Sequence, residues 1–162
     1  MNEQPIEVST DHTCVLAVLT RRLAQSGDTD RASLAAAAVR AMLRADTTFD
    51  RCCLPHYIAL APERGGREIQ IPISVEGDIA TRVLVWPIGS KDGMHPHVDG
   101  WTVFVPVTGQ LVSVEQPAGE PLVVGTLDLR EPQILRPEDA VKHRLRNQAD
   151  EVAVTIHVSG SI

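Results

Sequence analysis

Two histidines, His95 and His97, stand two positions apart in the strand-rich half of the sequence. Side chains of an extended strand alternate between its faces, so both imidazoles project to the same side and can hold one metal ion. Pro87, Gly89 and Gly93 precede the pair and predict a turn, which puts the histidines at the start of a strand. The spacing therefore predicts a metal site.

The residues around this pair resemble the two short motifs of the cupins, a superfamily of small β-barrels. Gly109 follows the pair about a dozen residues later, as in the first cupin motif. In the second motif a histidine is followed four residues later by asparagine, as His143 is by Asn147. The resemblance implies a mainly β fold, the cupin jelly-roll barrel, with one metal ion on His95, His97 and His143.

Thr102 stands where the first cupin motif usually has a glutamate, so the implied site has no carboxylate ligand. Three neutral imidazoles leave the full +2 charge of an ion in place. If they bind facially, they also leave coordination positions open for a substrate and a second small molecule. Imidazole suits Zn, Fe, Cu and Ni, so the ligands alone do not name the metal.

A closer resemblance is to the thiol dioxygenases, the cupin branch typified by cysteine dioxygenase. It rests on four short stretches: Val83–Trp86, His95–His97, His143–Asn147 and Ala153–Ser159. Members of this family use three histidines on Fe(II) and oxidise a thiol to a sulfinate with O₂. The resemblance implies that activity, with a small-molecule thiol and O₂ as substrates. Zn, Ni and Mn stay open as alternative metals.

The last of these stretches places Thr155, His157 and Ser159 at alternate positions, hence on one face of a strand. The resemblance implies that His157 and Thr155 take part in catalysis beside the metal. Two alternatives remain open. His157 could line the barrel and simply bond to Thr155, or it could replace His143 as a metal ligand.

The family resemblance also points to substrate-binding residues. Its members hold the substrate carboxylate with an arginine on an early strand, and Arg67 lies near that place, although an ungapped register puts Ile69 there. Trp101, which we also place among the substrate-binding residues, and Phe104 are predicted to be packing or pocket-wall residues rather than reactive ones. Ser159 and Thr102 replace a tyrosine and a cysteine that form a crosslink in some members, so no such crosslink can form.

Two other classes of function remain open from the sequence. One is a different metal-dependent cupin enzyme, such as a dioxygenase of a carbon substrate, an isomerase or a decarboxylase. The other is a non-catalytic cupin that binds a small ligand. The identity of the bound metal and the consumption of oxygen would separate these classes.

The elements that must position the histidines fall into two parts of a single predicted domain, residues 1–162. Apolar residues at helical spacing predict a helical segment over about residues 1–50, with a break at Gly27 and a cap at Asp28 or Asp30. From about residue 55, short Val- and Ile-rich stretches between Gly, Pro and Asp predict a β-barrel. The expected strands are Ile69–Val75, Ile79–Trp86, Trp101–Pro106, Gln110–Glu115, Leu122–Leu127 and Val152–Val158.

Composition limits the partners of this 162-residue chain. Its net charge of −6 argues against a general affinity for nucleic acid or for anionic membranes. No apolar run approaches the length of a membrane helix. Three cysteines, an odd number, favour reduced thiols and a cytoplasmic location. We expect a monomer or a homodimer, with His12 and His56 as surface or packing residues rather than ligands.

Overall fold

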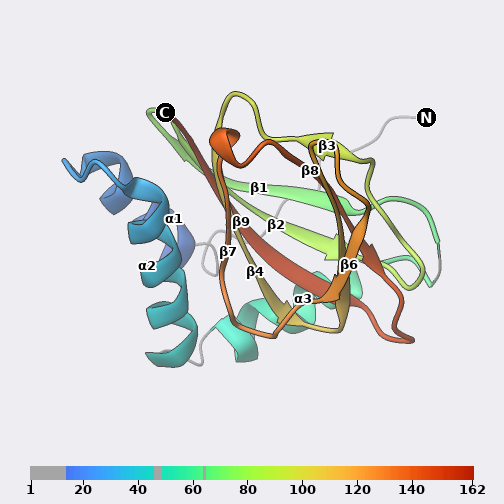
Figure 1. Cartoon of the computed structure of the whole chain (residues 1–162). Coiled ribbons are helices and arrows are strands. Elements are labelled where there is room, and N and C mark those ends of the chain that lie inside the picture. The colour runs from blue at the N-terminus through green and yellow to red at the C-terminus, as the bar shows by residue number, and fades with distance from the viewer. Residues whose placement is uncertain (1–13, 46–48, 64) are drawn as a thin grey trace, which may run out of the picture.

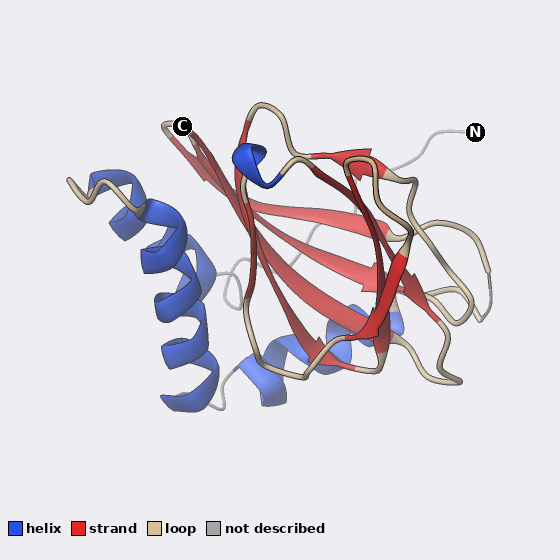
Figure 2. Cartoon of the chain, in the orientation of Figure 1, coloured by secondary structure: helices blue, strands red, loops and turns tan. Residues whose placement is uncertain are grey.

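The computed structural model describes residues 14–45, 49–63 and 65–162 (Figure 1). His12 lies outside the described residues. The α-helices gather at the N-terminal end of the chain, and strands predominate in the rest, which also contains one 3₁₀-helical turn (Pro137–Asp139) (Figure 2). The expectation of a mainly β chain with an N-terminal helical segment is confirmed. None of the helices in the described ranges is long and apolar enough to cross a membrane.

The two predicted helices are α1 (Cys14–Gln25) and α2 (Arg31–Ala45). Asp30 caps α2, because its Oδ1 accepts a hydrogen bond from the backbone N–H of Ser33 at 3.1 Å. A π-helical turn (Phe49–Cys53) and a short helix, α3 (Leu54–Ala59), follow. The helical segment thus extends beyond the predicted limit near residue 50. His56, predicted to be a surface or packing residue, lies exposed on α3.

The strands form two antiparallel sheets. The larger has the order β1-β2-β9-β4-β7 and the smaller the order β3-β8-β5-β6. All six predicted strands are present, with slightly different ends. The strand bounds are β1 (Ile69–Glu76), β2 (Ile79–Trp86), β3 (His95–Pro96), β4 (Gly100–Thr108), β5 (Leu111–Pro117), β6 (Val123–Thr126), β7 (Gln133–Leu135), β8 (Val141–Asn147) and β9 (Ala153–Ser161).

The two faces of the larger sheet have different neighbours. Helices α1, α2 and α3 pack against one face, and the smaller sheet faces the other (Figure 1). Alternate residues of β2, β4 and β9 project toward the helices and form the main apolar core. Members of this core include Val83, Val85, Val103, Val105, Val154, Ile156 and Val158, each at 0% exposure.

The remaining residues of the same strands project into the space between the two sheets. A second apolar cluster closes one end of this space, and it comprises Leu84, Trp86, Phe104, Leu111, Leu145 and Ala153. The rest of the space is lined by polar and charged side chains. The barrel therefore has a filled end and an open, polar end.

Candidate metal centre

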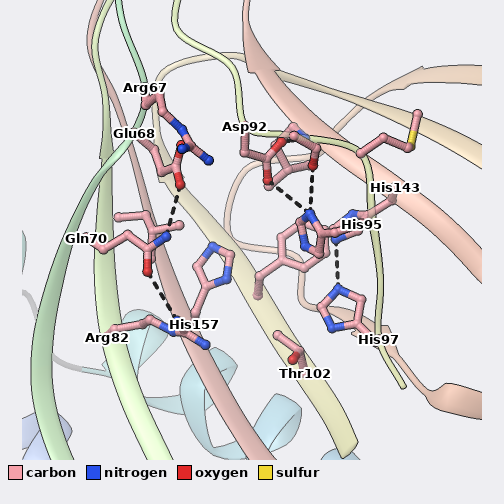
Figure 3. Close-up of a pocket in the computed structure, with 15 residues that line it drawn as sticks. Arg67, Glu68, Gln70, Arg82, Asp92, His95, His97, Thr102, His143 and His157 are labelled. Carbon is pink, nitrogen blue, oxygen red and sulfur yellow. Dashed lines mark hydrogen bonds and ion pairs between the residues drawn. The ribbon is translucent and has the colours of Figure 1, made fainter. Parts of the chain in front are cut away.

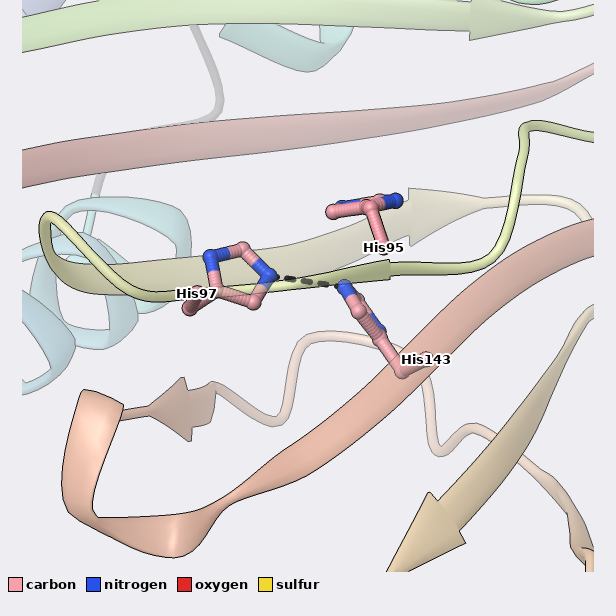
Figure 4. A group of neighbouring side chains, drawn as sticks. All are labelled: His95, His97 and His143. Atoms are coloured by element: carbon pink, nitrogen blue, oxygen red, sulfur yellow. Dashed lines mark hydrogen bonds between the residues drawn. The ribbon is translucent and has the colours of Figure 1, made fainter.

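Three histidines meet at the open end of the barrel (Figure 4). His95 begins β3, His97 follows that strand directly, and His143 lies opposite on β8, paired with His95 in the strand register. Each offers a ring nitrogen, and these atoms all lie within 4.8 Å of one another. The three residues that the sequence predicted as a group are thus brought together.

Two of the three histidines have the spacing of ligands on a single bound ion. The Nε2 atoms of His97 and His143 are 2.8 Å apart. A metal with bonds of about 2.0–2.1 Å to nitrogen holds two ligands at a right angle about 2.9 Å apart. His95 Nδ1 donates to the carbonyl of Gly93 at 2.8 Å, which leaves its Nε2 lone pair available for the ion. His97 and His143 therefore have the spacing of two ligands on one ion, and His95 presents a third nitrogen within 4.8 Å.

Burial keeps two of the three imidazoles, those of His97 and His143, neutral. Burial, followed by the neighbouring charge of His97 and then His95, lowers the pKa of His143 to about 3. Burial lowers the pKa of His97 to about 4, with His95 and Arg82 adding to the effect. Neutral imidazoles have lone pairs to donate, so both rings are in the form that binds a metal at pH 7.

One polar atom of the cluster also lacks a partner of its own. Nδ1 of His143 is buried, and no group in the described part of the chain bonds to it. Packing three imidazoles with nitrogens this close has a desolvation cost that a cation offsets. Thr102 lies beside the cluster where a carboxylate would otherwise reach it (Figure 3). No carboxylate belongs to the cluster among the described residues.

A carboxylate does lie behind one of the three histidines. Asp92 Oδ1 accepts the backbone N–H of Leu145 at 2.7 Å, and its Oδ2 is 3.8 Å from Nδ1 of His95. Burial raises the pKa of Asp92 to about 6. Asp92 therefore lies on the Nδ1 side of the His95 ring. Its hydrogen bond to Leu145 connects the loop before β3 to strand β8.

His157 stands across the cavity, and the strand register explains its place. It lies on the central strand β9, between Arg82 on β2 and Phe104 on β4. The ring of Phe104 stacks on His157 with centroids 5.6 Å apart, and its centroid lies 5.8 Å from that of His143. Phe104 thus separates His157 from the three-histidine cluster. The ring nitrogens of His157 do not belong to that cluster, so His143 is its third member.

The hydrogen bonds of Thr155 set the tautomer of His157. Trp86 Nε1 can only donate, and it donates to Thr155 Oγ1 at 2.9 Å. Thr155 is fully buried, and its only other side-chain partner in the described chain is His157 Nε2 at 2.9 Å. The hydroxyl therefore donates to Nε2, and the ring carries its proton on Nδ1. Burial, with a smaller effect of Arg82, lowers the pKa of His157 to about 3, so the ring is neutral.

The cavity between these walls has a volume of about 440 Å³. Besides the histidines it is lined by a group of charged and polar residues on β1, on β2 and just before β1 (Figure 3). Arg67, predicted to bind substrate, lies at this edge with an exposed side chain. Arg82, which the sequence analysis did not single out, projects from β2 on the cavity side, opposite His157.

Thr155, which is fully buried, does not line this cavity, and neither does Trp101. Trp101 lies on β4 one position before Thr102, and alternation turns its ring toward the helices, where it belongs to the main core. Gly160 pairs with it in the register, and a Cβ atom on Gly160 would lie 2.6 Å from Cζ2 of the Trp101 ring. The ring fills the space that this glycine leaves. Phe104, three positions further along β4, takes the cavity side instead.

The sequence matches no protein-family model and no curated protein. Solved structures do match. An uncharacterized conserved protein from Klebsiella pneumoniae, with a double-stranded β-helix domain, has a TM-score of 0.53 at 18% identity, over 65% of this chain and 86% of that one. The protein TT1209 from Thermus thermophilus has a TM-score of 0.50 at 18% identity, over 64% and 91%. BH2720 from Bacillus halodurans has a TM-score of 0.53 at 9% identity, over 60% and 73%.

At these identities the likeness concerns the fold alone. The double-stranded β-helix is the barrel of the cupins, and its two facing antiparallel sheets are those of this chain. The chain has the cupin jelly-roll fold, with helices at its N-terminal end and a three-histidine group that could hold a metal ion.

Proposed function

We propose that this protein is a non-haem Fe(II)-dependent thiol dioxygenase that converts a small thiol to its sulfinate with O₂. The observation that carries the proposal is the donor set: three imidazoles, with no carboxylate among the described residues of the cluster, in a cavity that also presents His157. The resemblance of four short stretches of sequence to the thiol dioxygenases agrees with it.

When bound, Fe(II) supplies a Lewis acid that keeps the thiol as a thiolate, together with the reducing power that O₂ activation requires. The reaction adds both atoms of O₂ to sulfur, so that a thiolate and O₂ give a sulfinate without a further oxidant. His95, His97 and His143 would hold the ion on one side. Thr102, which also lines the cavity, has no carboxylate to offer as a further ligand.

The protein's own residues contribute orientation. His157 carries its proton on Nδ1 because Thr155 bonds to Nε2, so the ring offers a hydrogen-bond donor to a ligand in the cavity. Phe104 holds the ring in place by stacking on it. A small thiol bound against this wall would have its sulfur directed toward the three histidines. Positioning of this kind is the principal contribution that a protein makes to such a reaction.

The test is oxygen uptake by protein loaded with Fe(II) without oxygen and supplied with cysteine, cysteamine or 3-mercaptopropionate. We expect uptake with at least one thiol, a product heavier by two oxygen atoms, and loss of both in His143→Ala. His56→Ala is the matched control, because His56 is exposed on α3, outside the residues that line the cavity. A stoichiometric metal other than iron, without thiol-dependent uptake, would exclude this function and favour a metal cupin of another chemistry.

A further inference from the structure

The cavity wall opposite the three histidines carries an acid and a base that do not pair with each other. Glu68 and Gln70 lie along this wall with Arg82, and His157 lies between them and the metal ligands (Figure 3). Gln70 separates the two charges, since its Nε2 donates to Glu68 Oε1 at 2.9 Å and its Oε1 accepts from Arg82 NH1 at 3.2 Å. The amide therefore holds both charged groups at fixed positions.

Each of these charges has bonding capacity left over. Glu68 Oε2 is buried and has no partner in the described part of the chain. Arg82 forms no ion pair with any described carboxylate, and only one of its nitrogens is engaged, by a neutral amide. A buried carboxylate oxygen without a hydrogen bond lowers the stability of the fold, and so does a guanidinium with few hydrogen bonds. A ligand that bonds to both groups would remove this cost.

Both charges act on the interior of the cavity. Glu68 and Arg82 both line the cavity that His95, His97 and His143 also line. Glu68 and Arg82 therefore face the same space as the metal ligands. Asp92, the other carboxylate there, already accepts from Leu145 and lies beside His95, so Glu68 is the acid with an oxygen to spare.

We propose that this wall binds an amino-acid head group, with the ammonium on Glu68 and the carboxylate on Arg82. This inference rests on the proposed function for the nature of the reacting group, a thiol at the other end of the ligand. With both charged groups held on the β1–β2 wall, the amine does not reach the metal ion, and the sulfur alone faces the three histidines. The carboxylate partner is Arg82, which lies inside the barrel, rather than the exposed Arg67.

Binding can be measured apart from oxidation with three thioethers, which keep all or part of the head group but lack a thiol. S-methylcysteine carries both charges, 3-(methylthio)propionate lacks the amine, and 2-(methylthio)ethylamine lacks the carboxylate. We expect calorimetry on the metal-loaded protein to show that S-methylcysteine binds about 10- to 100-fold more tightly than either truncated compound, as expected for hydrogen bonds to charged groups.

Two variants assign the charges. In Arg82→Gln, S-methylcysteine should no longer bind more tightly than 2-(methylthio)ethylamine, but it should still bind more tightly than 3-(methylthio)propionate. In Glu68→Gln, it should no longer bind more tightly than 3-(methylthio)propionate, but it should still bind more tightly than 2-(methylthio)ethylamine. Arg67→Gln is the matched control and should change neither preference. Circular dichroism and metal content identify any variant that fails to fold. In a folded variant, the affinities of the three thioethers are compared with one another, so a general change in affinity does not affect the result.

The outcomes separate the two proposals. Equal binding of all three thioethers, or loss of carboxylate selectivity in Arg67→Gln but not in Arg82→Gln, would overturn the head-group site. The expected binding pattern without oxygen uptake on any thiol would leave the head-group site in place and overturn the dioxygenase. Oxygen uptake that does not distinguish cysteine from cysteamine and 3-mercaptopropionate would support the dioxygenase and overturn the site.

Discussion

The two faces of the five-stranded sheet are built from alternate residues of the same strands, but they differ in chemistry. On β9, Ile156 and Val158 project toward the helices at 0% exposure, whereas Thr155 and His157 project into the barrel. On β2, Val83 joins the core and Arg82 lines the cavity. One face provides the apolar burial that stabilises the fold, and the other holds polar groups away from water at some cost in stability. Substitutions at adjacent positions should therefore have separable effects.

The largest expected effect is on the cavity side. His143→Ala removes one of three nitrogen ligands, and we expect Fe(II) affinity to fall about a thousandfold, since metal sites of this kind derive several kcal/mol from each ligand. Anaerobic calorimetry measures the affinity. The unfolding midpoint of the metal-free protein should change little or rise, because the buried Nδ1 without a partner is removed as well. An unchanged affinity would assign the third ligand to another residue, and His157 would be the first candidate.

On the helix side, Ile156→Ala should lower stability without changing metal affinity. Ile156 is fully buried between the sheet and the helices, and truncation should lower the free energy of unfolding by about 2–5 kcal/mol. Urea denaturation of the metal-free protein measures this change. Metal affinity in the folded variant should match that of the unaltered protein, and a parallel loss of affinity would show that the two faces are not independent.

Two buried threonines offer a matched pair across the sheet. Thr155→Val leaves Trp86 Nε1 and His157 Nε2 without a partner and should cost about 1–3 kcal/mol of stability. It should also lower kcat, with KM little changed, because the tautomer of His157 is no longer fixed. Thr81→Val removes the hydroxyl that forms a hydrogen bond with Thr20 on the helix side and should affect stability only. Equal effects of the two substitutions on kcat would contradict the role given to Thr155.

The pH dependence of stability should come from the cavity face. Burial lowers the pKa values of His97, His143 and His157 to about 4, 3 and 3, so the unfolded chain binds protons below about pH 6.5 that the folded protein does not. Their contribution is present above pH 6.5 and is lost as the pH falls. Asp92, with a pKa raised to about 6, acts in the opposite direction between about pH 4 and 6.

Three histidines outweigh one aspartate, so the metal-free protein should become less stable between pH 7 and pH 4, by an amount reduced by solvent at the partly exposed groups. Urea midpoints across this range measure the slope. His157→Gln should reduce it, while Ile156→Ala should shift every midpoint without changing the slope. A stability that is flat or rises toward pH 4 would mean that these imidazoles are protonated in the folded state.

The sequence predicted the elements whose pattern is strong and local. The alternation of Thr155 and His157, and of His95 and His97, was enough to place each pair on one face, because period-2 alternation holds in any extended strand. The helices α1 and α2 were recognisable from their spacing and from the capping residue Asp30.

Strand β8 was not predicted as a strand. Its outward positions carry Lys142, Arg144 and Arg146, and these charges mask the inward alternation of His143 and Leu145. Strand β7 is three residues long and has no pattern of its own. Such strands are defined by their partners in the sheet rather than by local sequence.

To predict which residues line the cavity, one must know which face of each strand points into the barrel. Strand β4 is buried on both sides from Trp101 to Val107, so its apolar run does not show which of Trp101 and Phe104 faces the cavity. Arg82 was missed, although a single charge within the apolar stretch Ile79–Trp86 is a signal. Only the pairing of β2 with β9 shows that Arg82 stands beside His157.

The central claim is that His95, His97 and His143 together hold one metal ion without a carboxylate. X-ray absorption spectroscopy of the Fe(II)-loaded protein tests it most directly, because scattering from imidazole rings gives the number of histidine ligands. We predict one ion per chain with three imidazoles, falling to two imidazoles or to no bound ion in His143→Ala. Fewer than three imidazoles in the unaltered protein, or a carboxylate ligand such as Asp92, would contradict the account.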